Sequence, residues 1–162
     1  EVIDALYDCS KAGVSITLIV RGFCCLRPQV SGLSDNIRVL SLVGPFLEHA
    51  RIFHFRSGAS LPEEGEFYIG SGDWMSRNLQ RRVEVAVPIE DIQLRKRLWN
   101  VLNLQVADNR LAWDMQEDGR YILRKPPNPE AEIFSQKILM DLARQRLALA
   151  SKEDSGNNSA GV

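Results

Sequence analysis

Two short segments of the chain combine residue types that can handle phosphate groups. In the first, His49 lies two positions before Arg51, so that an imidazole stands beside a permanent cation. Imidazole suits proton transfer and phosphoryl acceptance near neutral pH. In the second, the turn Gly-Ser-Gly-Asp at 70–73, the glycines permit close backbone approach, and Ser71 offers a hydroxyl and an N–H before an expected helix. Together the two segments predict a cradle for an anion.

A second arginine, Arg21, follows an apolar, β-rich run at 14–20 that predicts a buried central strand. Loops at the carboxyl ends of strands carry the ligands of α/β sheets. The guanidinium of Arg21 can contact two phosphate oxygens at once. We therefore place Arg21 in the same phosphate-handling site as His49.

Each of these residues also has a structural interpretation. An isolated histidine such as His49 is more often an ordinary surface or core residue. Arg51 and Arg27 could equally form surface salt bridges. Asp73 either orients His49 or a cation, or it caps a helix that begins at Trp74. His54 alternates with two phenylalanines in an expected strand, and we interpret it as structural.

The elements that would position these side chains alternate between helix and strand. Periodicity and turn residues predict helices at 4–12, 89–106 and 133–150, a helical turn at 46–50 after Gly44-Pro45, and a hairpin from 111–115 and 121–123. Further strands are expected at 14–20, 37–40, 52–55, 67–69 and 83–87. This alternation predicts an α/β fold in which helices flank a mixed sheet.

Three segments divide the chain. We expect a folded domain at 1–125, a C-terminal helix within 126–150 and a disordered tail at 151–162, where Ser, Asn, Gly and Asp replace any periodic apolar face. The chain starts at Glu1 inside an apolar helical pattern, which predicts that it belongs to a longer protein.

The order of the chemical residues resembles one half of the phospholipase D superfamily site. The superfamily has His-x-Lys, a strand and Gly-Ser-x-Asn, and two such halves face each other. Here Arg51 stands in place of the lysine, and the superfamily's aspartate, seven positions after the histidine, falls on Arg56. These departures argue against phosphodiesterase chemistry.

Four longer segments resemble the C-terminal domain of bacterial polyphosphate kinase, from about residue 1 to about residue 125. They are LIVRGFCCLRP at 18–28, GLSDNI at 32–37, FLEHAR at 46–51, and IGSGDWM with RNL at 69–79. One departure is Pro45, where the family often has arginine before Phe-Leu-Glu-His. The match in order and spacing is more specific than any single short motif.

The resemblance implies an enzyme that reversibly moves the terminal phosphoryl group of ATP onto polyphosphate through a phosphohistidine. That histidine lies in a preceding domain without a counterpart here. His49 corresponds to a second active-site histidine and is expected to be catalytic, as an imidazolium. ATP and phosphate would be contacted by Arg21, His49, Arg51 and Ser71. No metal ligand is assigned in this chain, and Mg²⁺ would be bound mainly by residues outside it.

The resemblance also implies the partners: ATP or ADP, inorganic polyphosphate, the remainder of the kinase and a second copy in a homo-oligomer. Two alternatives remain open, a non-catalytic phosphate-binding or oligomerisation module and a phospholipase D-like phosphodiesterase. By itself the chain is expected to show little or no turnover.

Composition bounds the location and the other ligands. The formal net charge of -1 gives no global attraction to nucleic acid, so an anion site must be local. Three cysteines without zinc-ligand spacing indicate reduced thiols, as in the cytoplasm. The apolar run at 14–20 is much shorter than the roughly 20 residues of a membrane span. We expect a cytoplasmic protein without a transmembrane or signal segment, and keep peripheral membrane association of the longer enzyme as an alternative.

Overall fold

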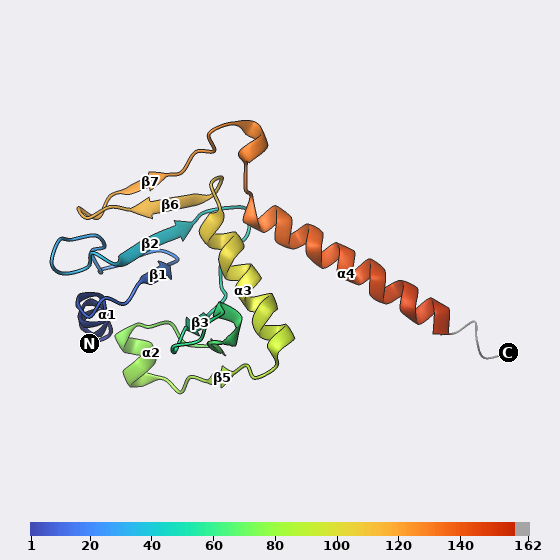
Figure 1. Ribbon diagram of the computed structural model, residues 1–162, viewed down its shortest axis with the longest axis horizontal. Coiled ribbons are helices and arrows are strands. Elements are labelled where there is room, and N and C mark those ends of the chain that lie inside the picture. The colour runs from blue at the N-terminus through green and yellow to red at the C-terminus, as the bar shows by residue number, and fades with distance from the viewer. Residues whose placement is uncertain (158–162) are drawn as a thin grey trace.

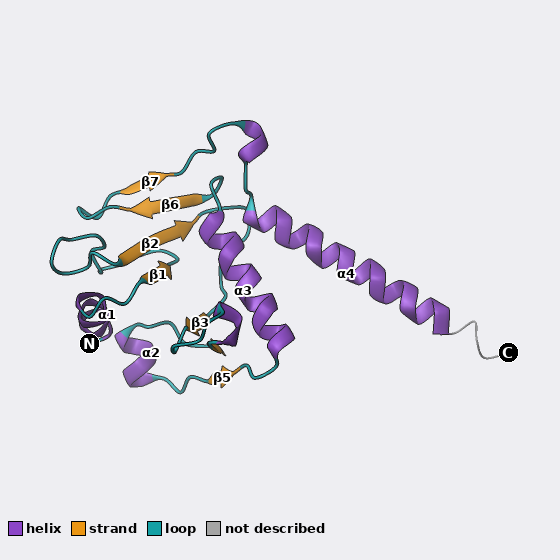
Figure 2. Cartoon of the chain, in the orientation of Figure 1, coloured by secondary structure: helices purple, strands orange, loops and turns teal. Residues whose placement is uncertain are grey.

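Two separate β-sheets with flanking helices form the framework of the molecule (Figures 1 and 2). The computed structural model describes the backbone of residues 1–157 and the side chains of residues 1–151. The helices are α1 (Val2–Lys11), α2 (Ser76–Arg81), α3 (Ile92–Ala107) and α4 (Ser135–Asn157), with 3-10 turns at Pro62–Glu64 and Pro129–Ala131. The expected α/β class, with a mixed sheet and flanking helices, is confirmed.

The larger sheet has the strand order β1-β2-β6-β7, formed by Ile16–Ile19, Ile37–Leu42, Ala112–Met115 and Tyr121–Leu123. β1 runs parallel to β2, in the register Ile16 to Ile37, whereas β6 and β7 pair antiparallel. The sheet is therefore mixed. We expected the 14–20 strand to be central, but β1 lies at the edge of the described sheet and is only half-buried.

Two apolar clusters hold this sheet together. On one side, α1 packs on a core that includes the fully buried Val39. The other cluster surrounds Leu40, which is also fully buried, and receives Val106 from α3 and Phe134 from the segment before α4. Because Val39 and Leu40 are neighbours in β2, their side chains point to opposite faces of the sheet. β2 is thus buried on both faces and is the central strand of the fold.

The smaller sheet is antiparallel, in the order β3-β4-β5, formed by Ile52–Phe55, Glu66–Gly70 and Ala86–Pro88. Sequence patterns did not reveal that these strands form a sheet of their own. His54 packs between Phe67 and Trp99 of α3, with ring centroids 4.5 and 4.8 Å away, and its Nε2 lies 2.9 Å from the Pro62 carbonyl. These contacts agree with a structural role for His54.

Helix α3 joins the two sheets and has the most clearly defined ends of the helices. Asp91 caps its start, where the carboxylate accepts the N–H groups of Gln93 and Leu94. Just after its end, the fully buried Asp108 accepts the N–H of Leu111 at 2.6 Å through one oxygen. Its other oxygen accepts the N–H and hydroxyl of Ser135 at 2.8 and 2.6 Å. Asp108 therefore fixes the start of α4 beside the end of α3.

The segment 44–50 is irregular, and the predicted helical turn over 46–50 is wrong. The side chain of Gln136 accepts a hydrogen bond from the Phe46 N–H at 3.2 Å and donates one to the Phe46 carbonyl at 2.8 Å. Both backbone groups thus pair with a distant side chain rather than with neighbours in a helix. This tertiary contact overrides the local preference of Gly44-Pro45.

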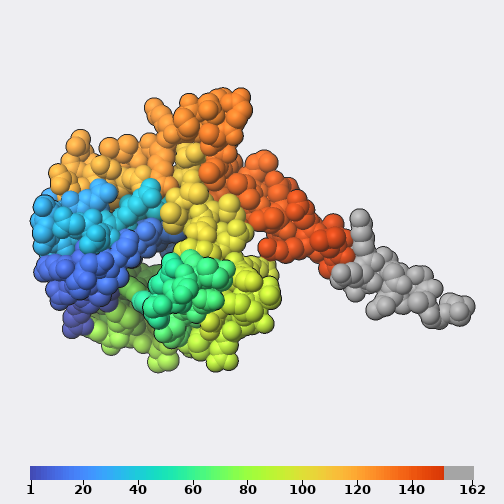
Figure 3. All heavy atoms as spheres, in the orientation of Figure 1, coloured from blue at the N-terminus to red at the C-terminus, as the bar shows by residue number. Residues whose placement is uncertain are grey.

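Helix α4 is longer than expected and projects from the body of the molecule (Figure 3). We predicted helix to residue 150 and a disordered tail at 151–162, but the helix includes 151–157. Leu147 and Leu149 are 70% and 62% exposed, so this half of the helix is not formed by burying an apolar face. Ser151 Oγ donates to the Leu147 carbonyl one turn earlier in this half of the helix. Residues 158–162 lie outside the described residues.

No helix within residues 1–157 is both long and apolar enough to cross a membrane.

Asp114 on β6 carries the ion pairs that tie the hairpin to the rest of the fold. Its carboxylate accepts two hydrogen bonds from Arg124 and contacts Arg38 of β2 at 3.2 Å. Arg124 also donates to the Val106 and Asp108 carbonyls at the end of α3, where a cation is favoured. The hydrogen bonds from Arg124 lower the pKa of Asp114 below its ordinary 3.8; both arginine charges add to this, and burial opposes it.

This pair predicts a defined pH dependence of stability. Because the folded pKa of Asp114 lies below the unfolded one, its stabilisation is present above the unfolded pKa and is lost as the pH falls through the folded pKa. The difference in unfolding free energy between the wild type and Asp114→Asn should be constant above about pH 5 and shrink below about pH 4. Urea unfolding at a series of pH values measures it. A difference that stays constant into strong acid would contradict this role.

Candidate functional site

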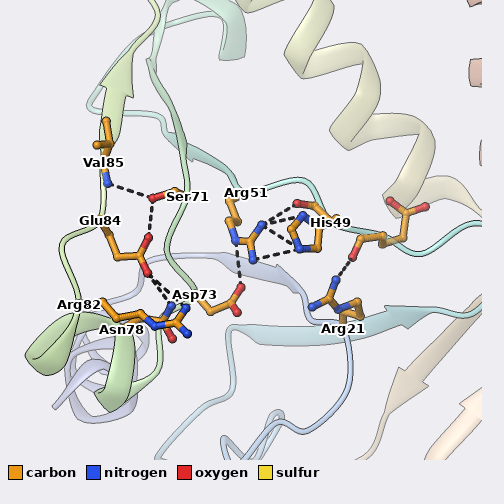
Figure 4. Close-up of polar contacts among 10 residues, drawn as sticks. Arg21, His49, Arg51, Ser71, Asp73, Asn78, Arg82, Glu84 and Val85 are labelled. Atoms are coloured by element: carbon orange, nitrogen blue, oxygen red, sulfur yellow. Dashed lines mark hydrogen bonds and ion pairs between the residues drawn. The ribbon is translucent and has the colours of Figure 1, made fainter.

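Parallel pairing of β1 and β2 brings two of the predicted residues to one edge of the larger sheet. Arg21 lies just beyond the carboxyl end of β1, and the loop that follows β2 carries His49. Because parallel strands end at the same edge, the two segments meet there. The Nη1 group of Arg21 donates to the carbonyl of Glu48, adjacent to His49, at 3.0 Å (Figure 4).

Antiparallel pairing of β3 and β4 brings in the next two residues. Arg51 immediately precedes β3, its carbonyl accepts the N–H of Gly70 at the end of β4 at 3.0 Å, and Asp73 follows in the next turn. Arg51 Nε donates to Asp73 Oδ1 at 3.1 Å, and Nη1 lies 2.8 Å from His49 Nδ1 and 3.1 Å from the His49 carbonyl. Arg21, His49, Arg51 and Asp73 thus form one group, which we term the edge cluster.

The guanidinium of Arg51 lies against the imidazole ring of His49. Nη1 lies 2.8 Å from Nδ1 and 3.3 Å from Nε2, and Nη2 lies 3.4 Å from Nε2, so both ring nitrogens face the cation. Because a guanidinium has only hydrogen-bond donors, a ring N–H must turn away from Arg51 to reach a phosphate oxygen. The catalytic role expected for His49 stays a prediction.

Ser71 does not point at the edge cluster. Its hydroxyl donates to the Glu84 carboxylate and accepts the N–H of Val85 at 3.0 Å, while its own N–H donates to the Val85 carbonyl (Figure 4). The helix expected directly after this turn begins only at Ser76, and Met75 rather than Asp73 is at its cap position. Phosphate binding by Ser71 stays a prediction, which requires its hydroxyl to exchange Glu84 for a phosphate oxygen.

The edge cluster is suited to anions rather than to a metal ion. The cluster contains two guanidinium groups and one imidazole but only one carboxylate, that of Asp73, which is already paired with Arg51. In the described part of the chain, no group of three or more His, Cys, Asp or Glu residues could hold a metal. These donors do not fit Mg²⁺, which prefers oxygen ligands.

Comparison with known proteins gives the family. The model of the polyphosphate kinase C-terminal domain 2 family matches residues 1–136. The chain belongs to this family. The polyphosphate kinase of Synechocystis sp. is 54% identical over 138 residues, which is 85% of this chain and 18% of that protein. The polyphosphate kinase of Thermosynechococcus vestitus is 53% identical over 140 residues, which is 86% of this chain and 19% of that protein.

A solved structure supports the same conclusion about the fold. The crystal structure of polyphosphate kinase from Porphyromonas gingivalis superposes with a TM-score of 0.81 at 38% sequence identity, over 90% of this chain and 22% of that chain. The resemblance deduced from the sequence is confirmed. The chain spans about a fifth of the length of the relatives that it matches.

The sequence patterns did not predict the buried residues that hold the loop of His49. The carboxylate of Glu48 accepts one hydrogen bond from Gln105 of α3 and one from Gln136 of α4. Both glutamines are only 5% exposed. An uncharged polar residue on the buried face of an amphipathic helix is a signal that could have found them, because such a group needs a buried partner.

Glu84 is the residue whose carboxylate accepts the hydrogen bond from the Ser71 hydroxyl. Its pKa lies below the ordinary 4.5, first because of the hydrogen bond from Ser71, then because of the bond from Asn78, with smaller effects of the Arg82 and Arg51 charges; burial opposes them. The Asn78 amide donates at 2.9 Å from a side chain that is only 4% exposed. The carboxylate of Glu84 therefore organises the turn after β4.

Ser71→Ala tests this placement. Removing the hydroxyl deletes the hydrogen bond that lowers the pKa of Glu84 most, so this pKa should rise toward 4.5. Side-chain carbon NMR over a pH titration reports it. Ser76→Ala, at an exposed serine five positions later, is the matched control and should leave the Glu84 titration unchanged. An unaltered titration in Ser71→Ala would mean that the hydroxyl faces elsewhere.

Proposed function

We propose that this chain is part of an enzyme that transfers the terminal phosphoryl group of ATP reversibly to polyphosphate, and that it supplies phosphate-contacting residues of that active site. The observation that carries the proposal is the convergence of Arg21, His49 and Arg51 on one sheet edge. The relatives are named polyphosphate kinases, and the family model covers the whole cluster. ATP, ADP and inorganic polyphosphate are the proposed ligands.

The composition of the edge cluster suits phosphoryl transfer. Such reactions need positioning and charge neutralisation of the transferred group more than covalent help. Arg21 and Arg51 provide two guanidinium forks for phosphate oxygens. With one ring nitrogen turned from Arg51 toward the phosphate, His49 can donate a hydrogen bond to the phosphoryl group or pass a proton to a leaving oxygen.

His49 is proposed to act without being phosphorylated. A nucleophilic imidazole needs a free lone pair, but Arg51 nitrogens lie 2.8 Å from Nδ1 and within 3.4 Å of Nε2. The phosphoryl group would instead move from ATP to a ring nitrogen of a histidine outside this chain, which releases ADP. A terminal oxygen of polyphosphate would then take the group from that histidine.

The remaining features of the proposal come from the family resemblance. Mg²⁺ would be bound mainly by residues outside this chain, the rest of the kinase would complete the site, and the assembled enzyme would be a cytoplasmic homo-oligomer. A phospholipase D-like phosphodiesterase is not supported. Arg56, where that superfamily has an aspartate, donates to the Ala59 and Ser60 carbonyls and offers no carboxylate.

The 162-residue chain should bind polyphosphate through the edge cluster. Removing one charge-assisted contact costs about 1.5 to 3 kcal/mol, so Arg21→Ala should weaken binding about tenfold or more. Titration calorimetry at physiological ionic strength measures the affinity. Arg97→Ala removes the same charge from an exposed position on α3 and is the matched control. Equal weakening by both variants would indicate non-specific attraction and contradict a site at Arg21.

Turnover can be tested in the Synechocystis kinase with residues 1–136 of this chain in place of its matching segment. General acid or hydrogen-bonding assistance contributes roughly 100-fold or more, so His49→Ala should cut polyphosphate synthesis by about that factor. His49→Gln, which can donate a hydrogen bond but cannot transfer a proton, separates the two roles. Near-normal synthesis by His49→Ala would refute a catalytic role, provided that the unsubstituted chimaera is active.

A further inference from the structure

Glu48 connects the edge cluster to the interior of the domain. Its carbonyl accepts the Arg21 guanidinium on the outer side of the loop, and its side chain points inward between α3 and α4. There, Oε2 accepts from Gln105 Nε2 at 2.8 Å and Oε1 accepts from Gln136 Nε2 at 2.7 Å. Each carboxylate oxygen thus has its own amide donor, from a different helix.

Gln136 also binds the backbone of the same loop. Its Oε1 accepts the Phe46 N–H, and its Nε2 donates to the Phe46 carbonyl as well as to Glu48. Both N–H groups of the amide and its oxygen are therefore engaged. This side chain pairs with both backbone groups of residue 46 as a neighbouring strand would, which holds the loop at this point.

Close packing leaves this loop little freedom to shift. A Cβ on Gly44 would lie 2.6 Å from Leu111 Cδ1 and 2.7 Å from Gln136 Oε1, so the backbone passes directly against both side chains. Asp108 in turn fixes Ser135, the residue before Gln136. The position of the Gln136 amide is consequently set by the junction of α3 and α4.

We propose that Gln105 and Gln136 are positioning residues of the phosphoryl site, acting through Glu48. They hold the backbone carbonyl of Glu48, which accepts the Arg21 guanidinium, and the adjacent His49, which contacts Arg51. Helix α3 and the start of α4 therefore belong to the site, although neither helix contacts the ligand. This role rests on the proposed function. Gln105 and Gln136 lie 57 and 88 positions after Glu48 in the chain, and the site therefore forms only when both helices are in place.

An exchange of the two side-chain types tests the proposal. Gln105→Glu sets two carboxylates face to face and breaks the pairing. Glu48→Gln alone keeps it, because the Gln105 amide can turn over and accept through Oε1 the N–H that the new amide at 48 donates. The double variant E48Q/Q105E restores it, because the new amide at 48 can donate to the new carboxylate at 105 and still accept from Gln136.

Two readouts on the 162-residue chain follow the exchange. NMR signals of the His49 ring and the Arg21 Nε–H should shift in Gln105→Glu and return in the double variant, while Glu48→Gln alone stays near the wild type. Polyphosphate affinity should fall about tenfold in Gln105→Glu, as for loss of one hydrogen bond to a charged group, and recover in the double variant. All measurements are made well below the melting temperature of each variant, so that a change in stability alone does not alter them.

Gln145→Glu on the exposed part of α4 changes the charge by the same amount as Gln105→Glu, and it should leave both readouts at wild-type values. Unchanged His49 and Arg21 signals in folded Gln105→Glu, or no recovery in the double variant, would overturn the proposal. If Gln105→Glu does not fold, Gln105→Leu, which removes the donor without adding a charge, takes its place. Absence of polyphosphate binding by the wild type would refute the proposed function instead, while the NMR signals still test the positioning.

Discussion

The parallel pairing of β1 with β2 is the constraint on which the site depends. Parallel strands end at the same edge of a sheet, so Arg21 after β1 and the His49 loop after β2 must meet there. β2 is buried on both faces and pairs with β6 along the edge opposite β1. These contacts fix the position at which the His49 loop leaves the sheet. In the smaller sheet, the antiparallel pairing of β3 with β4 sets the start of β3 beside the end of β4, which brings Arg51 and Asp73 together. Two different sheets thus contribute to one cluster of cations.

The interior of the domain sets the detailed geometry of that edge. The loop that carries His49 has no helix or strand of its own, and it is held by side-chain amides from α3 and α4. The buried carboxylate of Asp108 joins those two helices. The surface that would meet phosphate is therefore supported by a polar network with buried groups, in which each carboxylate oxygen has a donor. Such networks specify one arrangement, because an unpaired member is costly in a low-dielectric interior.

Local patterns predicted the parts of the structure that local interactions decide. The periodicity of α3, the hairpin around Gly119 and the strands from 37 and 52 appear where the sequence indicated them. The order of the motifs identified the family, and the pairing of His49 with Arg51 followed from their spacing. Long-range contacts decided the rest. Segment 46–50 is not helical, because Gln136 binds its backbone, and the Ser71 hydroxyl binds Glu84. The strands on either side of β4 form a separate second sheet. None of these partners lies close enough in the sequence for periodicity to reveal it.

The central claim is that Arg21, His49 and Arg51 form one phosphate site. It is tested most directly by NMR of the 162-residue chain, following the Arg side-chain Nε–H and His49 ring signals as polyphosphate is added. The account predicts that the signals of these three residues shift together and follow a single binding curve, and that those of Arg95 and Arg97 on α3 do not. Shifts that centre on α3, or separate curves for Arg21 and Arg51, would contradict it.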